Sequence, residues 1–525
     1  MNKNQNESVE ISVRPKDLHN EELILRKTAA KLKISASDIQ EVKVIRRSVD
    51  ARPKIPVYRL RVRAVFDNVS GPVARGFVPQ IVKAGKKVLI IGAGPAGYFA
   101  ALECIRQGLI PIIIERGRDV RARRRDLKAI QQDGVVNPDS NYCFGEGGAG
   151  TYSDGKLYTR SHKRGNIERI LTILVEHGAH QDILIDAHPH IGSNKLPAII
   201  QRIRETITAC GGQVLFQHKV IDFILSHKIC EGVVVVDDTG SQISMLADAV
   251  ILATGHSARD IFDLCIKHDV ELEAKDFALG VRIEHPQALI DHIQYNQQQR
   301  EENLPASSYS LACQVSGVGV FSFCMCPGGL IVPAATSPGE IVVNGMSLSK
   351  RDSPYANAGT VVEISQAYLQ KEGFSGVLAG VDYQRSIERA VFEAGDGSQR
   401  APAQRLTDFV SRQHSKNDMS SSYIPGVYAA PLHQLLPEFI SRKLRDAIVS
   451  FESKMKGYLT EEAIIVGLES RTSSPIRIPR DKNSLMSPGV QSLFPCGEGA
   501  GYAGGILSAA MDGINVARKV SEHLE

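Results

Sequence analysis

The chain lacks the features that mark several specialised classes of protein. It contains no tryptophan, and its formal net charge is only +4 over 525 residues. An excess of basic residues this small gives no sign of a nucleic-acid partner. The start, MNKNQNESVE, has no apolar signal-peptide core, and no later apolar run is long enough to span a bilayer. We therefore expect neither a nucleic-acid partner nor a membrane partner.

Cysteine and histidine are present without the spacing of a disulfide scaffold or a metal site. The nine cysteines are scattered and odd in number, which suits a reducing cytosol better than a disulfide framework. The spacing of His177, His180, His188 and His190 does not place four ligands on one helix face. The sequence therefore predicts a cytoplasmic location and no metal.

The most informative segment is VLIIGAGPAGYFAALECIRQGLIPIIIE, residues 88–115. It begins with a short apolar run suited to a buried parallel strand, and Gly92, Gly94 and Gly97 follow as GxGxxG. The first glycine permits a tight turn, the second lets the backbone approach a pyrophosphate, and the third lets a helix pack close to the strand. Glu115 lies 18 residues after Gly97, where an acid can accept hydrogen bonds from a ribose. The segment predicts a βαβ unit that binds an adenine dinucleotide.

Two other segments match GxGxxG without this context. The match at 145–150 follows NYCF, which is too short and too polar for a strand of this kind. The match at 499–504 has Glu522 at that distance, but no second strand follows it. The sequence therefore predicts a single dinucleotide fingerprint.

Three separated segments together resemble the FAD domain of the glutathione-reductase superfamily. They are the fingerprint at 92–115, the ATG sequence at 253–255 and the Gly-Glu motif at 497–505. The resemblance implies that FAD is the cofactor, that Glu498 bonds the ribityl chain, and that a helix starting near Gly504 points its positive end at the flavin pyrimidine edge. The cofactor-binding residues that it implies are Gly92, Gly94, Pro95, Ala96, Gly97, Glu115, Arg116, Gly147, Gly148, Val220, Thr254, Gly255, Gly497, Glu498, Gly504, Gly505 and Ile506.

Longer motifs extend the resemblance to almost the whole chain. The chain is similar to a family of uncharacterised bacterial FAD-dependent dehydrogenases, whose members also carry an N-terminal α/β module. The motifs that carry this similarity are FGEGGAGTYSDGKLYTR (144–160), LGVRIEHPQ (279–287), FCMCPGG (323–329), VNGMSLSKRDSPYANAG (343–359), ESRTSSPIRIPRD (469–481) and CGEGAGYAGGI (496–506). The resemblance implies the cofactor and the architecture, but it names no substrate.

The expected fold class is α/β: a Rossmann-like FAD-binding domain with an inserted α+β substrate or cap domain and a small N-terminal α/β module. With 43% hydrophobic residues, the chain can bury the cores of two or three domains. The expected boundaries are 1–80 for the N-terminal module, 85–270 for the first part of the FAD domain, 271–464 for the inserted domain and 465–525 for the C-terminal part of the FAD domain.

Three candidates for catalysis come from loops and from closely spaced cysteines. Lys156 follows the second glycine cluster; a lysine near a flavin would raise its reduction potential, whereas a lone loop lysine is more often a solvated surface charge. Cys324 and Cys326 form a CxC sequence before Pro327. This pair could pass electrons to the flavin, or it could be two packed apolar cysteines. Both interpretations stay open at this point.

Three further candidates come from segments rich in arginine. Arg282 and His285 lie in VRIEHP, and Arg471 lies in RTSSPIR. Arginines in a substrate pocket suit carboxylate or phosphate ligands through bidentate bonds. The same arginines could instead form buried structural ion pairs. His256, directly after the ATG sequence, is expected near the nucleotide.

The expected function is that of a FAD-dependent oxidoreductase, a dehydrogenase that passes hydride between a small-molecule substrate and the flavin. The partners expected with it are that substrate and either a separate electron acceptor or transiently bound NAD(P)H. The arginine-rich stretch 118–125 is expected to be a solvated helix face that partly neutralises the FAD phosphates. The alternatives are a flavin-dependent RNA-modifying enzyme and a non-catalytic flavin-binding redox sensor.

Overall fold

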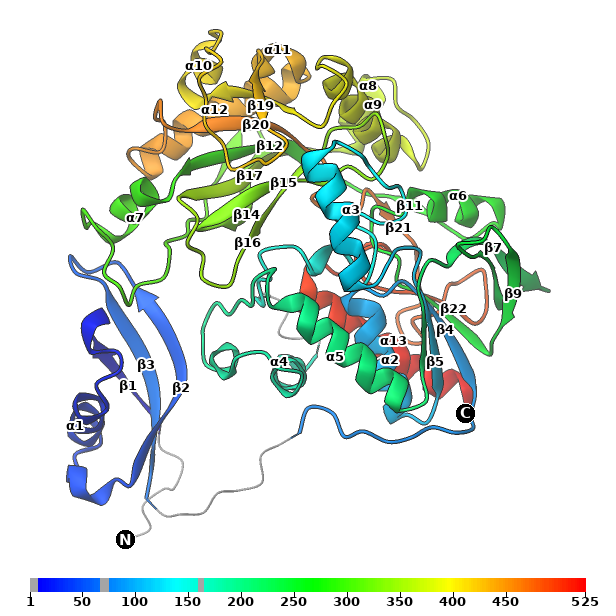
Figure 1. Cartoon of the computed structure of the whole chain (residues 1–525), viewed down its shortest axis with the longest axis horizontal. Helices are drawn as coiled ribbons and strands as arrows, with labels where there is room; N and C mark the ends of the chain where they lie inside the picture. The colour runs from blue at the N-terminus through cyan, green and yellow to red at the C-terminus, as the bar shows by residue number, and fades with distance from the viewer. Residues whose placement is uncertain (1–7, 67–74, 159–164) are drawn as a thin grey trace.

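The computed structural model describes residues 8–66, 75–158 and 165–525. In these residues a small N-terminal sheet, a parallel sheet and a large antiparallel sheet form three units (Figure 1). The small sheet lies at one side of the molecule, and the antiparallel sheet lies above the parallel one in this view. None of the helices among the described residues combines the length and the apolar character that crossing a bilayer requires.

The N-terminal unit is a three-stranded antiparallel sheet with one helix. Its strand order is β1-β3-β2, and its elements are β1 (Ser8–Val13), α1 (Glu21–Leu32), β2 (Glu41–Asp50) and β3 (Val57–Val65). Strand β3 alternates, because Tyr58, Leu60, Val62 and Ala64 are buried and the residues between them are not. Arg47 joins this unit to the rest of the molecule by donating hydrogen bonds to Asp182 and Asp186.

The parallel sheet has five strands in the order β22-β10-β4-β5-β6. All four strand pairs are parallel. The strands are β4 (Lys87–Ile91), β5 (Ile110–Ile114), β6 (Gln213–Leu215), β10 (Ala249–Leu252) and β22 (Leu493–Pro495). Residues 88–91 of β4 are all buried, as expected of a strand covered on both faces.

Two helices pack closely at the centre of this unit. They are α2 (Pro95–Arg106), which follows β4, and α13 (Ile506–Leu524), which closes the chain. A Cβ on Gly513 of α13 would lie 2.1 Å from the carbonyl oxygen of Ala96 on α2. Only a glycine at position 513 therefore allows the two helices this separation, which holds the end of the chain against the fingerprint.

The antiparallel unit is built on a seven-stranded sheet in the order β13-β14-β17-β12-β20-β18-β19. Every neighbouring pair is antiparallel except β18 and β19. The strands are β12 (Phe277–Pro286), β13 (Ala312–Val315), β14 (Val318–Cys326), β17 (Tyr355–Ile364), β18 (Ala401–Arg405), β19 (Val427–Ala429) and β20 (Ile464–Glu469). Helix α12 (Glu438–Lys454) packs against β13, β14 and β17.

The structure differs from one expected domain boundary. Strand β20 begins at Ile464 and pairs with β12 and β18 of the antiparallel sheet. A boundary between residues 464 and 465 would cut this strand, so the antiparallel unit extends to Glu469. A short, fully buried strand carries no local pattern that tells which of two sheets it joins.

The remaining elements connect or cover these units. Strands β7 (Lys219–Ser226), β8 (Ile229–Val236) and β9 (Gln242–Leu246) form an antiparallel sheet beside the parallel one, β15 (Gly329–Pro333) pairs with β16 (Val343–Ser347), and β11 (Glu273–Ala274) pairs with β21 (Ile476–Arg477). The other helices are α3 (Val120–Gln132), α4 (Ile167–Glu176), α5 (Leu196–Ala209), α6 (Arg259–Lys267), α7 (Gln287–Tyr295), α8 (Gln366–Lys371), α9 (Ala379–Glu393), α10 (Leu406–Ser411) and α11 (Leu432–Leu435). The architecture confirms the expected class, a Rossmann-like domain with additional α+β parts.

Candidate cofactor site and adjoining cleft

A long cavity lies where β4, β5 and β10 end and the antiparallel unit begins. Ligands of open α/β sheets bind at these carboxyl ends of parallel strands. Of the residues predicted from the sequence, those that line the cavity are Gly92, Gly94, Pro95, Ala96, Glu115, Arg116, Gly148, Lys156, Val220, Thr254, Gly255, Cys324, Arg471, Glu498, Gly505 and Ile506. Those outside its lining are Gly97, Gly147, Gly497, Gly504, Arg282, His285 and Cys326.

The three fingerprint glycines have distinct surroundings. A Cβ on Gly92, whose φ is 109°, would lie 2.5 Å from the carbonyl oxygen of Ala253, and one on Gly97 would lie 2.0 Å from that of Gly92. These two positions therefore allow close backbone packing. Gly94 faces the cavity instead, since a Cβ there would have only the Cα of Gly148 nearby, at 4.0 Å. Gly94 thus leaves room for a ligand rather than for the protein.

Glu115 lies at one end of the cavity and is only 5% exposed. Its carboxylate accepts hydrogen bonds from the backbone N–H groups of Ala93, Gly117 and Gly145, each at 2.9 Å. Oε1 accepts two of these bonds and Oε2 accepts one, so Oε2 keeps a free acceptor position. The carboxylate therefore shapes three loops and can also accept a bond from a ribose hydroxyl.

The opposite part of the cavity holds the start of helix α13. Gly505 precedes the helix with φ 82° and makes no side-chain capping bond, and both Gly505 and Ile506 line the cavity. The helix is 19 residues long. Its N-terminal end therefore presents backbone N–H groups and a partial positive charge where an anionic or polar ligand would bind.

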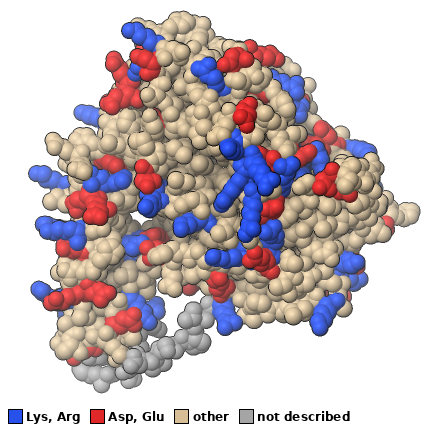
Figure 2. Space-filling view, viewed as in Figure 1, with Lys and Arg blue, Asp and Glu red and all other residues tan. Residues whose placement is uncertain are grey.

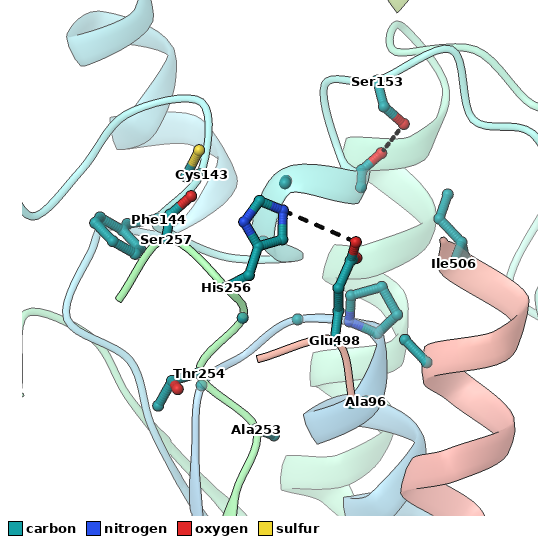
Figure 3. Close-up of a pocket in the computed structure, with 18 of the residues that line it drawn as sticks. Ala96, Cys143, Phe144, Ser153, Ala253, Thr254, His256, Ser257, Glu498 and Ile506 are labelled. Carbon is teal, nitrogen blue, oxygen red and sulfur yellow. Dashed lines mark hydrogen bonds and ion pairs between the residues drawn. The ribbon is translucent and has the colours of Figure 1, made fainter. Parts of the chain in front are cut away.

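Glu498 and His256 face each other across this part of the cavity (Figure 3). Glu498 Oε1 lies 3.8 Å from His256 Nε2. Burial raises the pKa of Glu498 to about 7, although the Gly505 N–H and Lys275 act against this rise. Burial, assisted by Arg471 and other cations, lowers the pKa of His256 to about 4. His256 is therefore neutral at pH 7, and the two groups do not form an ion pair.

The chemistry of these groups fits FAD. The cavity runs from Glu115 and Val220 to Cys324 on the antiparallel unit and to Arg471, which follows that unit in the chain. It offers an acceptor for a ribose, a glycine turn for a pyrophosphate, and a helix N-terminus for a polar ring edge. The carboxyl group of Glu498 lies between the glycine turn and the helix N-terminus, and it can bond to polyol hydroxyls. The fold and this cavity define a dinucleotide-binding flavoprotein.

Comparisons with known proteins agree with this class. Residues 276–472 match the family model described as "FAD-dependent protein, C-terminal domain-like", and residues 5–65 match a domain of unknown function. The chain is 38% identical over 522 residues to an uncharacterized protein of Clostridium beijerinckii, covering 95% of this chain and 96% of that one. The chain belongs to the same family as that protein, a family of FAD-binding flavoproteins, and FAD is its cofactor.

Solved flavoprotein structures resemble the chain only weakly. The flavin-dependent brominase Bmp2 is 12% identical with a TM-score of 0.38, covering 84% of this chain and 79% of that one. A geranylgeranyl bacteriochlorophyll reductase-like protein of Thermoplasma acidophilum is 13% identical with a TM-score of 0.35, covering 83% and 78%. At such scores these likenesses carry no functional weight.

A second, larger cleft adjoins the cofactor cavity and has a volume of about 1250 Å³. Lys156 and Cys324 line both the cavity and the cleft. The cleft also carries Arg351, Lys454 and Lys456, and the described residues that line it include no aspartate or glutamate. Its charge therefore suits a ligand with carboxylate or phosphate groups.

The two candidate arginines are both engaged in buried ion pairs. Arg282 is fully buried and donates hydrogen bonds of 2.6 and 3.0 Å to Glu469. Arg471 lines the cavity, but it donates to Glu388 and to Glu340. The sequence left open whether these arginines bind substrate or form structural ion pairs. In the structure both side chains form ion pairs.

His285 lies in the core of the antiparallel unit and lines neither the cavity nor the cleft. It is fully buried, its Nε2 lies 2.8 Å from the carbonyl oxygen of Tyr458, and its ring packs 4.6 Å from the Tyr458 ring. Burial lowers the pKa of His285 to about 4. The structure thus gives this histidine a packing role rather than access to a ligand.

The arginine-rich stretch is only partly solvated. Helix α3 carries exposed basic residues that form a patch in the middle of the face shown in Figure 2, namely Arg121, Arg124, Arg125 and Lys128. Arg123 of the same helix is fully buried and donates to the carbonyl oxygens of Asn141, Tyr142 and Glu146. The expectation of a solvated face is therefore wrong for Arg123, because its guanidinium holds the second glycine cluster in place.

Several residues of the site were not singled out as candidates from the sequence. Asp154 is 1% exposed and pairs with both Arg351 and Lys156. Arg351 and Lys454 belong to segments far apart in the chain that meet only at the cleft. No motif spacing could place them together, because their proximity results from the packing of the antiparallel unit.

Proposed function

We propose that this protein is a FAD-dependent dehydrogenase of the glutathione-reductase-like superfamily with a single nucleotide-binding domain. It passes hydride between a small anionic substrate and the flavin. The observation that carries the proposal is the shared wall of Lys156 and Cys324, through which the basic cleft adjoins the cofactor cavity. A substrate in the cleft would thus lie beside the end of the cavity that is far from Glu115, which holds the ribose.

The chain's own residues would orient and shield the reactants. Bound FAD supplies two-electron hydride chemistry. Arg351 and Lys454 would bind the anionic groups of the substrate, while Gly505 and the first turn of α13 would stabilise negative charge at the ring edge. Glu498, whose pKa burial raises to about 7, is able to take up or release a proton near neutral pH.

The proposal includes a separate electron acceptor, with transient NAD(P)H as the alternative hydride donor. It involves no nucleic-acid or membrane partner. We place the reaction in the cytoplasm, which the nine free cysteines support. No observation on the described residues favours an RNA substrate or a purely sensory role over catalysis.

The test is an anaerobic screen of metabolites for bleaching of the flavin absorbance. We expect bleaching by one or more carboxylated or phosphorylated donors, and we expect Arg351→Met to raise the donor concentration needed for half-bleaching by about tenfold. A matched control is Arg400→Met, which removes an exposed arginine outside the cleft. Bleaching only by uncharged donors, or no bleaching by any donor, would overturn the proposal.

A further inference from the structure

The thiol of Cys324 lies on the wall shared by the cofactor cavity and the basic cleft. It is partly exposed, and its Sγ lies 3.9 Å from Lys156 Nζ. Lys156 also donates to the carbonyl oxygen of Met325, so its ammonium group is fixed beside the thiol. A reactive group at this position can meet a ligand on either side of the wall.

The charges around this thiol, which lie on buried side chains and on the partly exposed Lys156, do not balance. Asp154 pairs with Lys156 and Arg351, and Glu469 pairs with Arg282. Together these two groups hold three cations and two carboxylates. His190 is next to them, but burial lowers its pKa to about 4, so it adds no charge at neutral pH. Glu498 faces the thiol from the cavity, and burial keeps its carboxyl group half protonated near pH 7. A thiolate at Cys324 would neutralise the excess cation, and an unpaired buried charge is costly.

The second cysteine is placed behind the first. Cys326 is fully buried, and its Sγ lies 3.3 Å from the carbonyl oxygen of Cys324 and 3.9 Å from Arg282 Nη1. Hydrogen bonding from the Cys326 thiol, with Lys156 and Arg282, outweighs burial and lowers the pKa of Cys324 well below its ordinary value. The same contact, together with burial, raises the pKa of Cys326. One thiol is thus accessible and acidic, and the other is shielded and protonated.

The backbone is distorted at this pair. Cys324 has a φ of 46°, in the left-handed region, and the register of β14 against β17 shifts between Phe323 and Cys326. Such a bulge re-aims a side chain, and strain at a non-glycine residue is typical of functional sites. Two packed apolar cysteines would need neither the bulge nor the neighbouring lysine.

We propose that Cys324 and Cys326 form a redox-active thiol pair that reduces an anionic disulfide bound in the basic cleft. Cys324 is the attacking thiolate and Cys326 is the resolving thiol. This inference deepens the proposed function, because it names the chemical class of the electron acceptor, and it rests on that function only for the return of electrons to the pair.

The proposed reaction balances in two exchange steps. The Cys324 thiolate attacks one sulfur of the disulfide, the S–S bond of the substrate breaks, and the first thiolate leaves. Cys326 then attacks Cys324 Sγ, the second thiolate leaves with the proton of Cys326, and a Cys324–Cys326 disulfide remains. Two electrons have passed from the cysteines to the substrate. Two electrons and one proton, which oxidation of the donor supplies, restore the thiolate of Cys324 and the thiol of Cys326.

The first test measures thiol reactivity in the wild-type holoprotein. Alkylation by iodoacetamide at pH 7 is followed by peptide mass spectrometry, with Cys313, also partly exposed, as the internal reference. We expect Cys324 to react at least about tenfold faster, since an ordinary thiol is only a few per cent thiolate at this pH. Lys156→Met should remove most of the difference, whereas Lys267→Met, at an exposed lysine that pairs with Asp222, should not. Equal alkylation rates at Cys324 and Cys313 would contradict the proposal that Cys324 is a thiolate.

The second test traps the exchange with two disulfides of opposite charge, dithiodipropionate and cystamine. In Cys326→Ser we expect a stable mixed disulfide on Cys324, forming at least about tenfold faster with the dianionic probe. In the wild type we expect a Cys324–Cys326 peptide that is two hydrogens lighter and carries no adduct. A persistent adduct in the wild type would contradict the resolving role of Cys326. Equal rates for the two probes would contradict an anionic substrate.

These readouts require no turnover. Their failure would leave the proposed hydride transfer standing, and absence of donor bleaching would leave the thiol pair standing. The alkylation test uses unaltered protein, so it remains decisive even where a cysteine variant does not fold.

Discussion

The carboxylate of Glu115 accepts a hydrogen bond from the backbone N–H of Gly145 at 2.9 Å. This bond joins the end of the βαβ fingerprint to the second glycine cluster, part of which also lines the cofactor cavity. Glu115 therefore helps to build the cavity that its own side chain lines.

We expect Glu115→Ala to weaken FAD binding and also to destabilise the protein without FAD. Each loss corresponds to about 1.5–3 kcal/mol, because the hydrogen bonds involve a charged acceptor. Glu176→Ala is the matched control, since Glu176 accepts bonds from the backbone N–H groups of Gly76 and Phe77 but does not line the cavity. FAD titration and chemical unfolding measure the two effects. Equal FAD affinity in both variants would show that the ribose is held elsewhere.

The fingerprint glycines should separate folding from cofactor binding. Gly94→Ala is expected to fold normally and to lose FAD affinity by tenfold or more, because the new methyl group projects into the cavity. Gly97→Ala is expected to destabilise the protein itself by about 1–3 kcal/mol or more, because its Cβ would meet the Gly92 carbonyl oxygen at 2.0 Å. Gly489→Ala, with its nearest neighbour at 3.9 Å, is the control. Thermal unfolding of the FAD-free proteins and FAD titration distinguish the outcomes, and a Gly94→Ala variant with normal affinity would contradict the assignment.

Glu498 should make the FAD-free protein less stable as the pH rises from about 4.5 to 7. Burial raises its pKa to about 7 in the folded state, against 4.5 for the free group, so the folded protein keeps a proton that the unfolded chain has lost. The stability from this group is complete below pH 4.5 and disappears through pH 7.

Glu498→Gln cannot titrate, so its stability relative to wild type should improve by about 2 kcal/mol across this range. Urea unfolding at several pH values measures the difference, and exposed Glu462→Gln serves as control. A constant difference between Glu498→Gln and wild type would contradict the raised pKa.

Breaking the buried pair of Arg282 and Glu469 should lower the free energy of unfolding far more than breaking an exposed pair. Glu469→Ala leaves a guanidinium that is 0% exposed without its main partner, and we expect a loss of about 3–5 kcal/mol in the free energy of unfolding. Glu273→Ala breaks the exposed pair with Arg477 and should cost less than about 1 kcal/mol. Denaturant unfolding compares them, and similar losses would mean that solvent reaches Arg282.

The helices and strands that depend on neighbouring residues could be predicted from the sequence. The apolar run before Gly92 and the glycine spacing depend on neighbouring residues, and β4 and α2 follow them. The ATG and Gly-Glu segments were expected to meet the fingerprint by resemblance, and Thr254 and Glu498 do line its cavity.

The partners of buried charges could not be predicted in this way. Arg282 meets Glu469 and Arg471 meets Glu388 only because β12, β20 and α9 pack together, which no spacing in the chain encodes. The same holds for Lys156 and Cys324, which are 168 positions apart. The expected boundary between residues 464 and 465 cuts strand β20 for a related reason, since pairing with β12 decides the place of this strand.

The parallel sheet takes its edge strand β22 and the helix α13 from the last 33 residues of the chain, after the whole antiparallel unit. Because domains fold as their residues emerge during synthesis, the antiparallel unit can form on the ribosome before the nucleotide site is complete. The last elements of the cofactor cavity are therefore synthesised after the antiparallel unit. A chain cut before Leu493 keeps all seven strands of the antiparallel sheet but lacks the helix whose N-terminal end lines the cofactor cavity.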